Sequence, residues 1–278
     1  MPKTQTGQEY SEATPDKLRA FEYFMGYHAG VSKHILNRNR RYSGYAYIDL
    51  NCGAGYQPEY REFGDRAYGS PIIATRQALN HQLDPLLYFV DVRTEAIKAL
   101  RKSILHKFAN LPYFALASDN ALFVPKLIEY LPMGDLLGLI YLDPNGNQEL
   151  PLKALQKFYG NRTFSSIDVL MNLSATNLKR WFNNPKAKGR WGEYGLQEII
   201  DSVPKKHWFI RYPVNKLFKW TFLYGTNWAK QKDLNQIHLY NIESESGQAI
   251  LRHLLDCQNN PLPIIGQQQC KQLSLPIH

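Results

Sequence analysis

The sequence predicts an α/β protein built on a mostly parallel β-sheet with helices on both faces. Short apolar runs alternate with longer segments whose apolar residues recur at helical spacing, which is typical of parallel strands joined by crossover helices. Several runs are apolar almost throughout, as expected for strands buried on both faces. Near the C-terminus two β-rich runs follow each other closely, which favours an antiparallel pair that closes the sheet.

The predicted elements follow in order. Residues 1–17 are expected to form a flexible tail, and residues 18–278 a single domain. The first helical pattern is interrupted at Tyr27-His28-Ala29-Gly30 and resumes at Lys33-His34. Later helices are predicted from residue 72, with Ser70 as N-cap, and at 94–108, 121–130 and 248–255. Seven strands are predicted at 45–50, 86–92, 113–118, 136–142, 167–173, 207–214 and 219–227, with an eighth candidate at 237–242.

Composition narrows the class of protein. The 278 residues are 44% hydrophobic, which is enough for a sizeable core, and the formal net charge is +9. A surplus of this size favours a polyanionic partner, above all nucleic acid, although a merely basic soluble protein remains the alternative. The sequence shows no long apolar run and no signal peptide, so a cytoplasmic location without a membrane is expected. Three cysteines without metal-type spacing indicate neither a disulfide framework nor a zinc site.

The run YAYIDLNCGAGY, residues 45–56, has the pattern of a nucleotide-binding first loop. An apolar strand ends at Asp49 and is followed by Gly53-Ala54-Gly55. Two glycines separated by one residue let the backbone turn sharply and approach a ligand closely. A lone Gly-X-Gly is a weak signal, because ordinary tight turns produce it as well.

Acids follow three successive predicted strands: Asp49, Asp91 and Asp119, the last with Asn120 beside it. The carboxyl ends of parallel strands face one crevice, where an acid after the second strand can accept ribose hydroxyls and a polar side chain after the third can bind the adenine amine. A helix N-cap is the ordinary alternative for each acid.

The cofactor that best fits this pattern is S-adenosylmethionine (SAM). NAD fits less well, because Tyr56-Gln57-Pro58 stand where its third glycine belongs, and because Asp91 lies about 36 residues beyond Gly55 instead of the usual ~20. No Gly-Lys-Ser/Thr follows the glycines, so a Walker loop is excluded.

A second constellation, Asp143-Pro144-Asn145-Gly146, follows the most apolar strand. A carboxylate beside a proline-fixed backbone carbonyl can hold an exocyclic amine by its two hydrogens and orient its lone pair. We therefore consider Asp143, Pro144 and Asn145 as catalytic candidates. Asp-Pro-Asn-Gly is also a good turn sequence, and this alternative stays open.

These motifs together resemble the class I SAM-dependent methyltransferases. YIDLNCGAGY, GSPIIA, FVDV and YLDPNG are similar to motifs of the three-Cys-motif partner proteins. The Tyr27–Gly30 and Lys33-His34 segments more distantly resemble the large-subunit ribosomal RNA adenine-N6 methyltransferases, whose fourth-strand signature is Asp-Pro-Pro-Tyr. Here Asn145 and Gly146 replace the second proline and the tyrosine.

The resemblance implies a Rossmann-like class I methyltransferase fold with a seven-stranded sheet. It also implies that Asp143 faces the methyl acceptor and that SAM is contacted by Lys33, Gly53, Gly55, Asp91 and Asp119. Asp49 and Asn120, which stand at the ends of the first and third predicted strands, complete the candidate cofactor site.

A basic aromatic insert at about 174–206 is the candidate for nucleic-acid binding. Cationic side chains neutralise phosphates and aromatic rings stack on exposed bases; the residues concerned are Lys179, Arg180, Trp181, Lys186, Lys188, Arg190 and Trp191. An insert packed onto the sheet is the alternative.

Two principal hypotheses remain from the sequence. The first is a SAM-dependent methyltransferase that acts on DNA or RNA, with N6 of adenine as its target. The second is a divergent binding protein on the same scaffold that works with a partner protein in a mobile-element or defence system. Methylation of a protein or small molecule is a third option.

Overall fold

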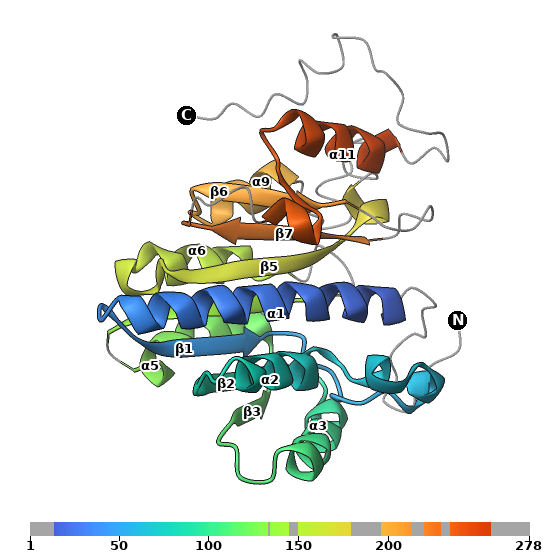
Figure 1. The fold of residues 1–278 in the computed structure, drawn as a ribbon, viewed down its shortest axis with the longest axis vertical. Helices are drawn as coiled ribbons and strands as arrows, with labels where there is room; N and C mark the ends of the chain where they lie inside the picture. The colour runs from blue at the N-terminus through green and yellow to red at the C-terminus, as the bar shows by residue number, and fades with distance from the viewer. Residues whose placement is uncertain are drawn as a thin grey trace.

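The protein is built around one eight-stranded sheet, seen in a computed structural model that describes residues 14–132, 134–144, 150–178, 196–212, 220–228 and 234–256 (Figure 1). The strand order is β3-β2-β1-β4-β5-β7-β6-β8. The strands are β1 (Tyr42–Asp49), β2 (Pro85–Asp91), β3 (Phe114–Ala117), β4 (Asp135–Leu142), β5 (Ile167–Ser174), β6 (His207–Arg211), β7 (Trp220–Thr226) and β8 (Leu239–Asn241).

The five strands β1 to β5 are parallel, whereas β7 pairs antiparallel with both β5 and β6. The order 3-2-1-4-5 is that of the doubly wound nucleotide-binding sheet, in which the chain switches direction of winding between β1 and β4. The predicted Rossmann-like α/β fold with a mostly parallel sheet and antiparallel closing strands is therefore confirmed. The sheet has eight strands where seven were predicted, because Leu239–Asn241 adds β8 to the edge beside β6.

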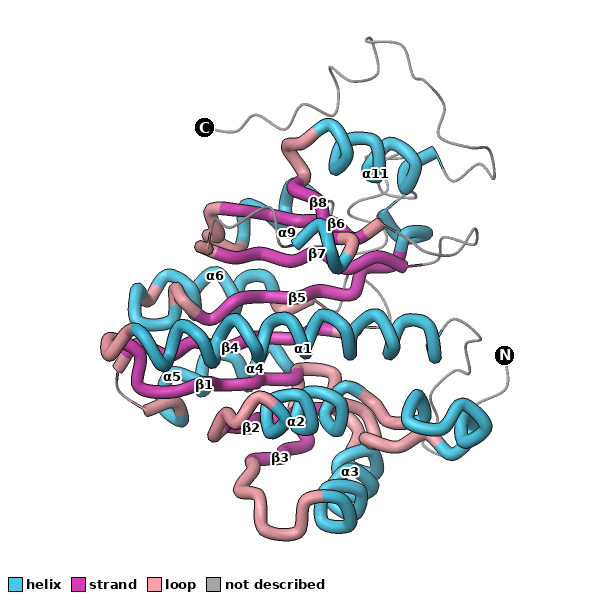
Figure 2. The backbone as a smooth tube through the Cα atoms, viewed as in Figure 1, coloured by secondary structure: helices cyan, strands magenta, loops and turns pink. Residues whose placement is uncertain are grey.

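Helices cover both faces of the sheet (Figure 2). On one face lie α1 (Thr14–Arg38), α2 (Ser70–Asn80) and α3 (Thr94–Lys107), and on the other α4 (Asn120–Phe123), α5 (Leu127–Tyr130), α6 (Leu152–Gly160), α9 (Leu196–Ser202) and α11 (Glu245–Asp256). Because strand side chains alternate, each central strand contributes to two separate buried clusters. The sheet is thus buried on both sides, as its apolar runs predict.

Helix α1 is continuous, which corrects the predicted interruption at Gly30. The two glycines of Gly26-Tyr27-His28-Ala29-Gly30 face α2, where an added Cβ would lie 3.3 Å from Gln77 Oε1 at Gly26 and 3.1 Å from His81 Cε1 at Gly30. Glycine inside a helix costs about 1 kcal/mol relative to alanine. Close packing of α1 on α2 compensates for this loss.

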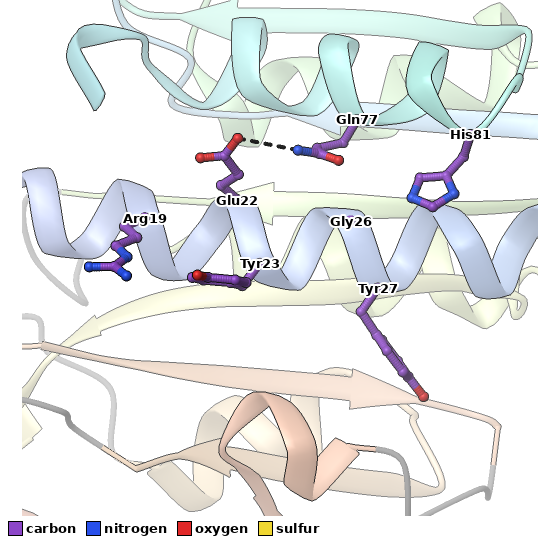
Figure 3. Close-up of a pocket in the computed structure, with 7 residues that line it drawn as sticks. All are labelled: Arg19, Glu22, Tyr23, Gly26, Tyr27, Gln77 and His81. Atoms are coloured by element: carbon purple, nitrogen blue, oxygen red, sulfur yellow. Dashed lines mark hydrogen bonds between the residues drawn. The ribbon is translucent and has the colours of Figure 1, made fainter. Parts of the chain in front are cut away.

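Between the outer sides of α1 and α2 lies an open groove of about 790 Å³ (Figure 3). One of its walls is fixed by Glu22, which accepts hydrogen bonds from Arg76 at 2.6 Å and Gln77 at 3.3 Å. The lining residues are Arg19, Glu22, Tyr23, Gly26, Tyr27, Gln77 and His81.

Helix α1 begins at Thr14, so residues 14–17, which were expected in the tail, form its first turn. The predicted helix at 121–130 is divided into α4, a 3₁₀ turn at Val124–Lys126 (η2) and α5, because Pro125 lacks the N–H that a continuous helix requires. No helix in the described part of the chain is long and apolar enough to span a membrane.

A buried polar cluster lies between α1 and the amino end of β5. Asp168 Oδ2 accepts a hydrogen bond from the Tyr224 hydroxyl at 2.5 Å and lies 3.4 Å from His28 Nε2. The other ring nitrogen of His28 is 3.0 Å from the Tyr45 hydroxyl. These contacts join α1, β1, β5 and β7 on one face of the sheet.

Candidate active site

The glycine loop lies where β1 ends. Gly53 and Gly55 have φ values of 62° and 75°, which glycine adopts without strain. The loop is held to the adjacent strand by the Cys52 N–H, which donates to Val90 O at 3.0 Å, and to the start of α2 by the Gly69 N–H, which donates to Gly55 O at 2.8 Å. At Gly55 an added Cβ would lie 2.5 Å from Leu100 Cδ1, so this position has no room for a side chain.

Asp49 lies beneath the loop and is fully buried. Its carboxylate accepts hydrogen bonds from the Tyr47 hydroxyl at 2.9 Å, from the Asn51 N–H at 3.2 Å and from Ser70. Burial raises the pKa of Asp49 to about 7. The structure therefore places Asp49 as a support of the loop. Ser70, predicted as the N-cap of α2, bonds Asp49 instead, and Gly69 is the N-cap.

Asp91 ends β2 and lies directly beside the glycine loop, with the Gly53 N–H donating to its Oδ2 at 3.0 Å. The guanidinium of Arg93 binds the same carboxylate through both of its oxygens, with Nε to Oδ1 and Nη2 to Oδ2 each at 2.9 Å. The Arg93 N–H adds a fourth contact at 2.9 Å to Oδ1. Asp91, the predicted ribose contact, therefore lies at the carboxyl edge of the sheet, and its carboxylate is covered by Arg93, which was not predicted from the sequence.

Asp119 and Asn120 follow β3 at the same edge of the sheet. Asp119 is the N-cap of α4 and accepts a hydrogen bond from the Ala121 N–H at 2.7 Å. The Oδ1 atom of Asn120 is buried and has no hydrogen-bond partner among the described residues. Two apolar side chains that follow β2 and β3 are exposed: Val92, after β2, by 72% and Leu122, in α4, by 67%. This end of the edge offers a hydrogen-bond acceptor and apolar surface.

Asp143 follows β4 and is held by residues from two other elements. Its Oδ2 forms an ion pair with Lys17 Nζ of α1 at 2.6 Å, and its Oδ1 accepts from Asn172 Nδ2 of β5 at 2.7 Å. The Asp143 N–H donates to Asn51 Oδ1 of the glycine loop at 3.3 Å. With 21% of its side chain exposed, Asp143 is oriented by these contacts and still reaches solvent.

Around Asp143 the site remains polar. The carboxylate fixes the orientation of the Asn172 amide, because a carboxylate accepts only from the NH₂ group. Asn172 Oδ1 is then buried without a partner in the described part of the chain. The Tyr141 phenol lies on the same face, and burial together with Asp143 and Asp49 raises its pKa well above the usual value. Pro144 directly follows Asp143, and Asn145 and Gly146 lie outside the described residues.

Lys33 is not brought to this site, which corrects its expected contact with the cofactor. Its Nζ donates to Gln82 O at 2.8 Å, in the connection that leads into the amino end of β2. At about 1.5 Å of rise per residue, Lys33 lies about 24 Å further along α1 than Lys17. His28 likewise packs near the amino end of β5. Lys17 is the lysine of α1 that reaches the site.

The predicted nucleic-acid contacts cannot be placed. All seven lie at 179–195, outside the described residues: Lys179, Arg180, Trp181, Lys186, Lys188, Arg190 and Trp191.

Three residues of the site were not found from the sequence: Lys17, Arg93 and Asn172. For Asn172 a signal was available, because it and Asp168 are the polar positions within the apolar run IDVLMNL, and a buried polar side chain usually has a specific partner. Lys17 was missed because it is the last residue of the segment 1–17, which was expected to be a flexible tail. Arg93 has no distinguishing pattern.

No protein-family model matches the chain, and no curated protein matches it in sequence. Among solved structures, protein LPL1258 from Legionella pneumophila str. Philadelphia 1 is similar, with 15% identity, a TM-score of 0.52 and coverage of 82% of this chain and 91% of that one. Human methyltransferase-like protein 13 in complex with SAH shows 12% identity, a TM-score of 0.44 and coverage of 92% and 98%. The plantazolicin methyltransferase BamL, also with SAH, shows 11% identity, a TM-score of 0.39 and coverage of 91% and 82%. At such identities the Legionella similarity shows the fold alone, and the chain is a protein of the Rossmann-like α/β fold.

Proposed function

We propose that this protein is a SAM-dependent methyltransferase that acts on an exocyclic amine of nucleic acid, with N6 of adenine in DNA or RNA as the target. The observation that carries the proposal is the arrangement at the carboxyl edge of the sheet. There the glycine loop, Asp91 and Asn120 line one part of the edge, and Asp143, which is partly buried and still reaches solvent, follows the neighbouring strand β4.

The residues present fit SAM as cofactor. Gly53 and Gly55 give the tight turn that such a loop requires, Asp91 matches a ribose diol, and the unpartnered Asn120 Oδ1 matches an adenine amino group. When bound, SAM would supply an electrophilic methyl group on its sulfonium. SAM has no pyrophosphate, so its site does not need an α-helix N-terminus directly after the glycine loop. In this chain the loop leads into the 3₁₀ segment Pro58–Ala67 (η1) instead of an α-helix.

Asp143 would bind the amine that accepts the methyl group. Its carboxylate accepts an N–H of the amine, and the Pro144 carbonyl is available for the second hydrogen. Lys17 and Asn172 fix the orientation of the carboxylate, so the main contribution of the site is positioning. As the N–C bond forms, the bond between the methyl group and the sulfonium would break and leave a neutral thioether, and the methylated amine would release a proton to water.

Nucleic acid as the acceptor is favoured by the net charge of +9 and by the basic aromatic composition of residues 174–206. A base within a duplex must leave the stack before its amine reaches an enzyme crevice. The protein would therefore act on single-stranded or flipped bases.

The test combines binding with transfer. Calorimetric titration with SAM should show binding, and labelled methyl groups should appear in DNA or RNA oligonucleotides that contain adenine. Asp143→Asn should abolish transfer and leave SAM binding intact. Asp135→Asn, at the opposite end of the same strand where it pairs with Arg41, is the matched control and should retain activity. The absence of SAM binding at millimolar concentration would refute the proposal.

One observation favours the alternative of a methyltransferase-like binding protein that works with a partner protein. Asp91 is saturated by donors from its own chain, and Asn145-Gly146 replace the motif that would stack on a base. Transfer that depends on Asp143 would contradict this alternative. Transfer that proceeds without nucleic acid would instead indicate a protein or small-molecule acceptor.

A further inference from the structure

The carboxylate of Asp91 has no acceptor position left for a ligand. A carboxylate offers about four lone-pair positions, two on each oxygen. At Asp91, Oδ1 accepts from the N–H and Nε of Arg93, and Oδ2 accepts from the Gly53 N–H and from Nη2 of Arg93. A ribose that donates two hydroxyl hydrogens must therefore displace two of these donors.

The four donors are not equally replaceable. The N–H groups of Gly53 and Arg93 belong to the backbone that forms the edge of the site, so losing them requires the loop to unfold. The other two donors, Nε and Nη2, belong to the Arg93 side chain, which can turn away without a change in the backbone. The Arg93 side chain is 31% exposed whereas that of Asp91 is 6% exposed, so the guanidinium covers the carboxylate from the solvent side.

We infer that Arg93 acts as a latch on Asp91, which must open before the vicinal diol of a ligand can replace both guanidinium contacts. This inference rests on the proposed function. A diol offers two donors to two carboxylate oxygens and restores the full set of hydrogen bonds, whereas a ligand with a single hydroxyl leaves one acceptor position unfilled. Arg93 therefore limits the affinity of the site, and the Asp91 carboxylate favours ribosides over deoxyribosides.

The latch has a measurable effect on affinity. A ligand that binds only the open form has its dissociation constant increased by the inverse of the open fraction. Removal of the guanidinium makes the open form permanent, and the remaining two backbone donors still hold Asp91. For Arg93→Ala we expect SAM to bind about tenfold more tightly than to the wild type. Arg93→Lys keeps the charge without the two-pronged geometry and should lie between them.

The experiment is calorimetric titration of the full-length wild type, Arg93→Ala and Arg93→Lys with SAM, SAH and 2′-deoxyadenosine. The gain for Arg93→Ala should be large for SAM and SAH. The single-hydroxyl probe should gain by about the same factor, because every ligand that requires the open form carries the same cost of opening. Arg76→Ala is the matched control: it removes one charge and an ion pair with Glu22 at 2.6 Å, away from Asp91, and should leave the affinities unchanged.

A gain in affinity is a result that structural damage does not produce. In the Asp91→Asn background the effect of Arg93→Ala should disappear, because the latch acts through the Asp91 carboxylate. Equal or weaker SAM binding by Arg93→Ala, with binding by the wild type intact, would overturn the latch and leave the proposed function standing. If neither the wild type nor any Arg93 variant binds SAM, the proposed function fails and the latch fails with it.

Discussion

Asp49 is an acid whose titration depends strongly on burial. Burial raises its pKa from 3.8 to about 7, so between these values the folded protein binds a proton that the unfolded chain has released. The contribution of Asp49 to the free energy of unfolding is therefore highest below about pH 4. It falls as the pH rises to about 7, by at most about 4 kcal/mol.

The substitution Asp49→Asn should remove this dependence. Relative to the wild type, the variant should gain stability steadily from pH 4 to pH 7, because it has no proton to lose. Urea unfolding at a series of pH values, followed by tryptophan fluorescence, measures the difference. Parallel curves for the two proteins across this window would contradict the expectation.

A companion variant tests the cause of the shift. The Tyr47 hydroxyl donates to Asp49 and stabilises its charged form, so Tyr47→Phe should raise the pKa of Asp49 further. The fall in stability should then extend to a higher pH than in the wild type.

At the scale of single residues the sequence located the acids but not their partners. Asp91 and Asp143 were recognisable because each ends an apolar strand, and strand ends are visible in the pattern of hydrophobicity. Their contacts with Arg93, Lys17 and Asn172 depend on side-chain direction and on strand order. The pairing of Lys17 with Asp143 also spans 126 residues, and no local pattern encodes it.

Among the elements, α1 and α2 pack at a distance set by glycines. In a helix interior alanine is about 1 kcal/mol more favourable than glycine, but a Cβ at Gly30 would lie only 3.1 Å from the ring of His81. Gly30→Ala should thus change stability little in the wild type, because crowding cancels the gain. In a His81→Ala background it should stabilise the protein by about 1 kcal/mol.

Urea denaturation of the four proteins in this double-mutant cycle gives the coupling energy. Gly26→Ala is the control, because its Cβ would meet the flexible end of Gln77 at 3.3 Å, which can move away. An identical gain from Gly30→Ala in both backgrounds would show that the helices do not crowd each other there.

Strands were predicted to within a few residues because long apolar runs have few alternatives to burial in a sheet. The errors concern glycine and proline in helices. An interruption was predicted at Gly30, but packing on α2 keeps the helix intact. The helix predicted at 121–130 contains Pro125, which divides α4 from α5. The first depends on a tertiary contact and the second on the backbone N–H that proline lacks.

For the whole molecule, the net charge of +9 predicts salt-dependent binding of nucleic acid. If Lys186, Lys188 and Arg190 contact phosphates of a single strand, replacing all three by Gln should lower the slope of log K against log salt concentration by about 2. Fluorescence anisotropy with a labelled oligonucleotide between 50 and 300 mM salt, about the range in which such binding varies, measures the slope.

The control for this prediction removes the same charge elsewhere. Gln at the exposed Lys98, Lys126 and Lys153 lowers the net charge equally but lies on three helical segments away from the insert. If both triple variants change the slope to the same extent, general charge and not the insert is responsible for binding.

The long reach of α1 also has a consequence for how the protein is made. The helix leaves the ribosome before the sheet does, and its partners in β5 and after β4 come much later: Asp143 follows Lys17 by 126 residues, and Asp168 follows His28 by 140. During synthesis the apolar face of α1 therefore has only part of its final cover. We expect chains that stop before β5 to need protection from aggregation and to lack the acceptor site, which is completed only when the end of β5 has been synthesised.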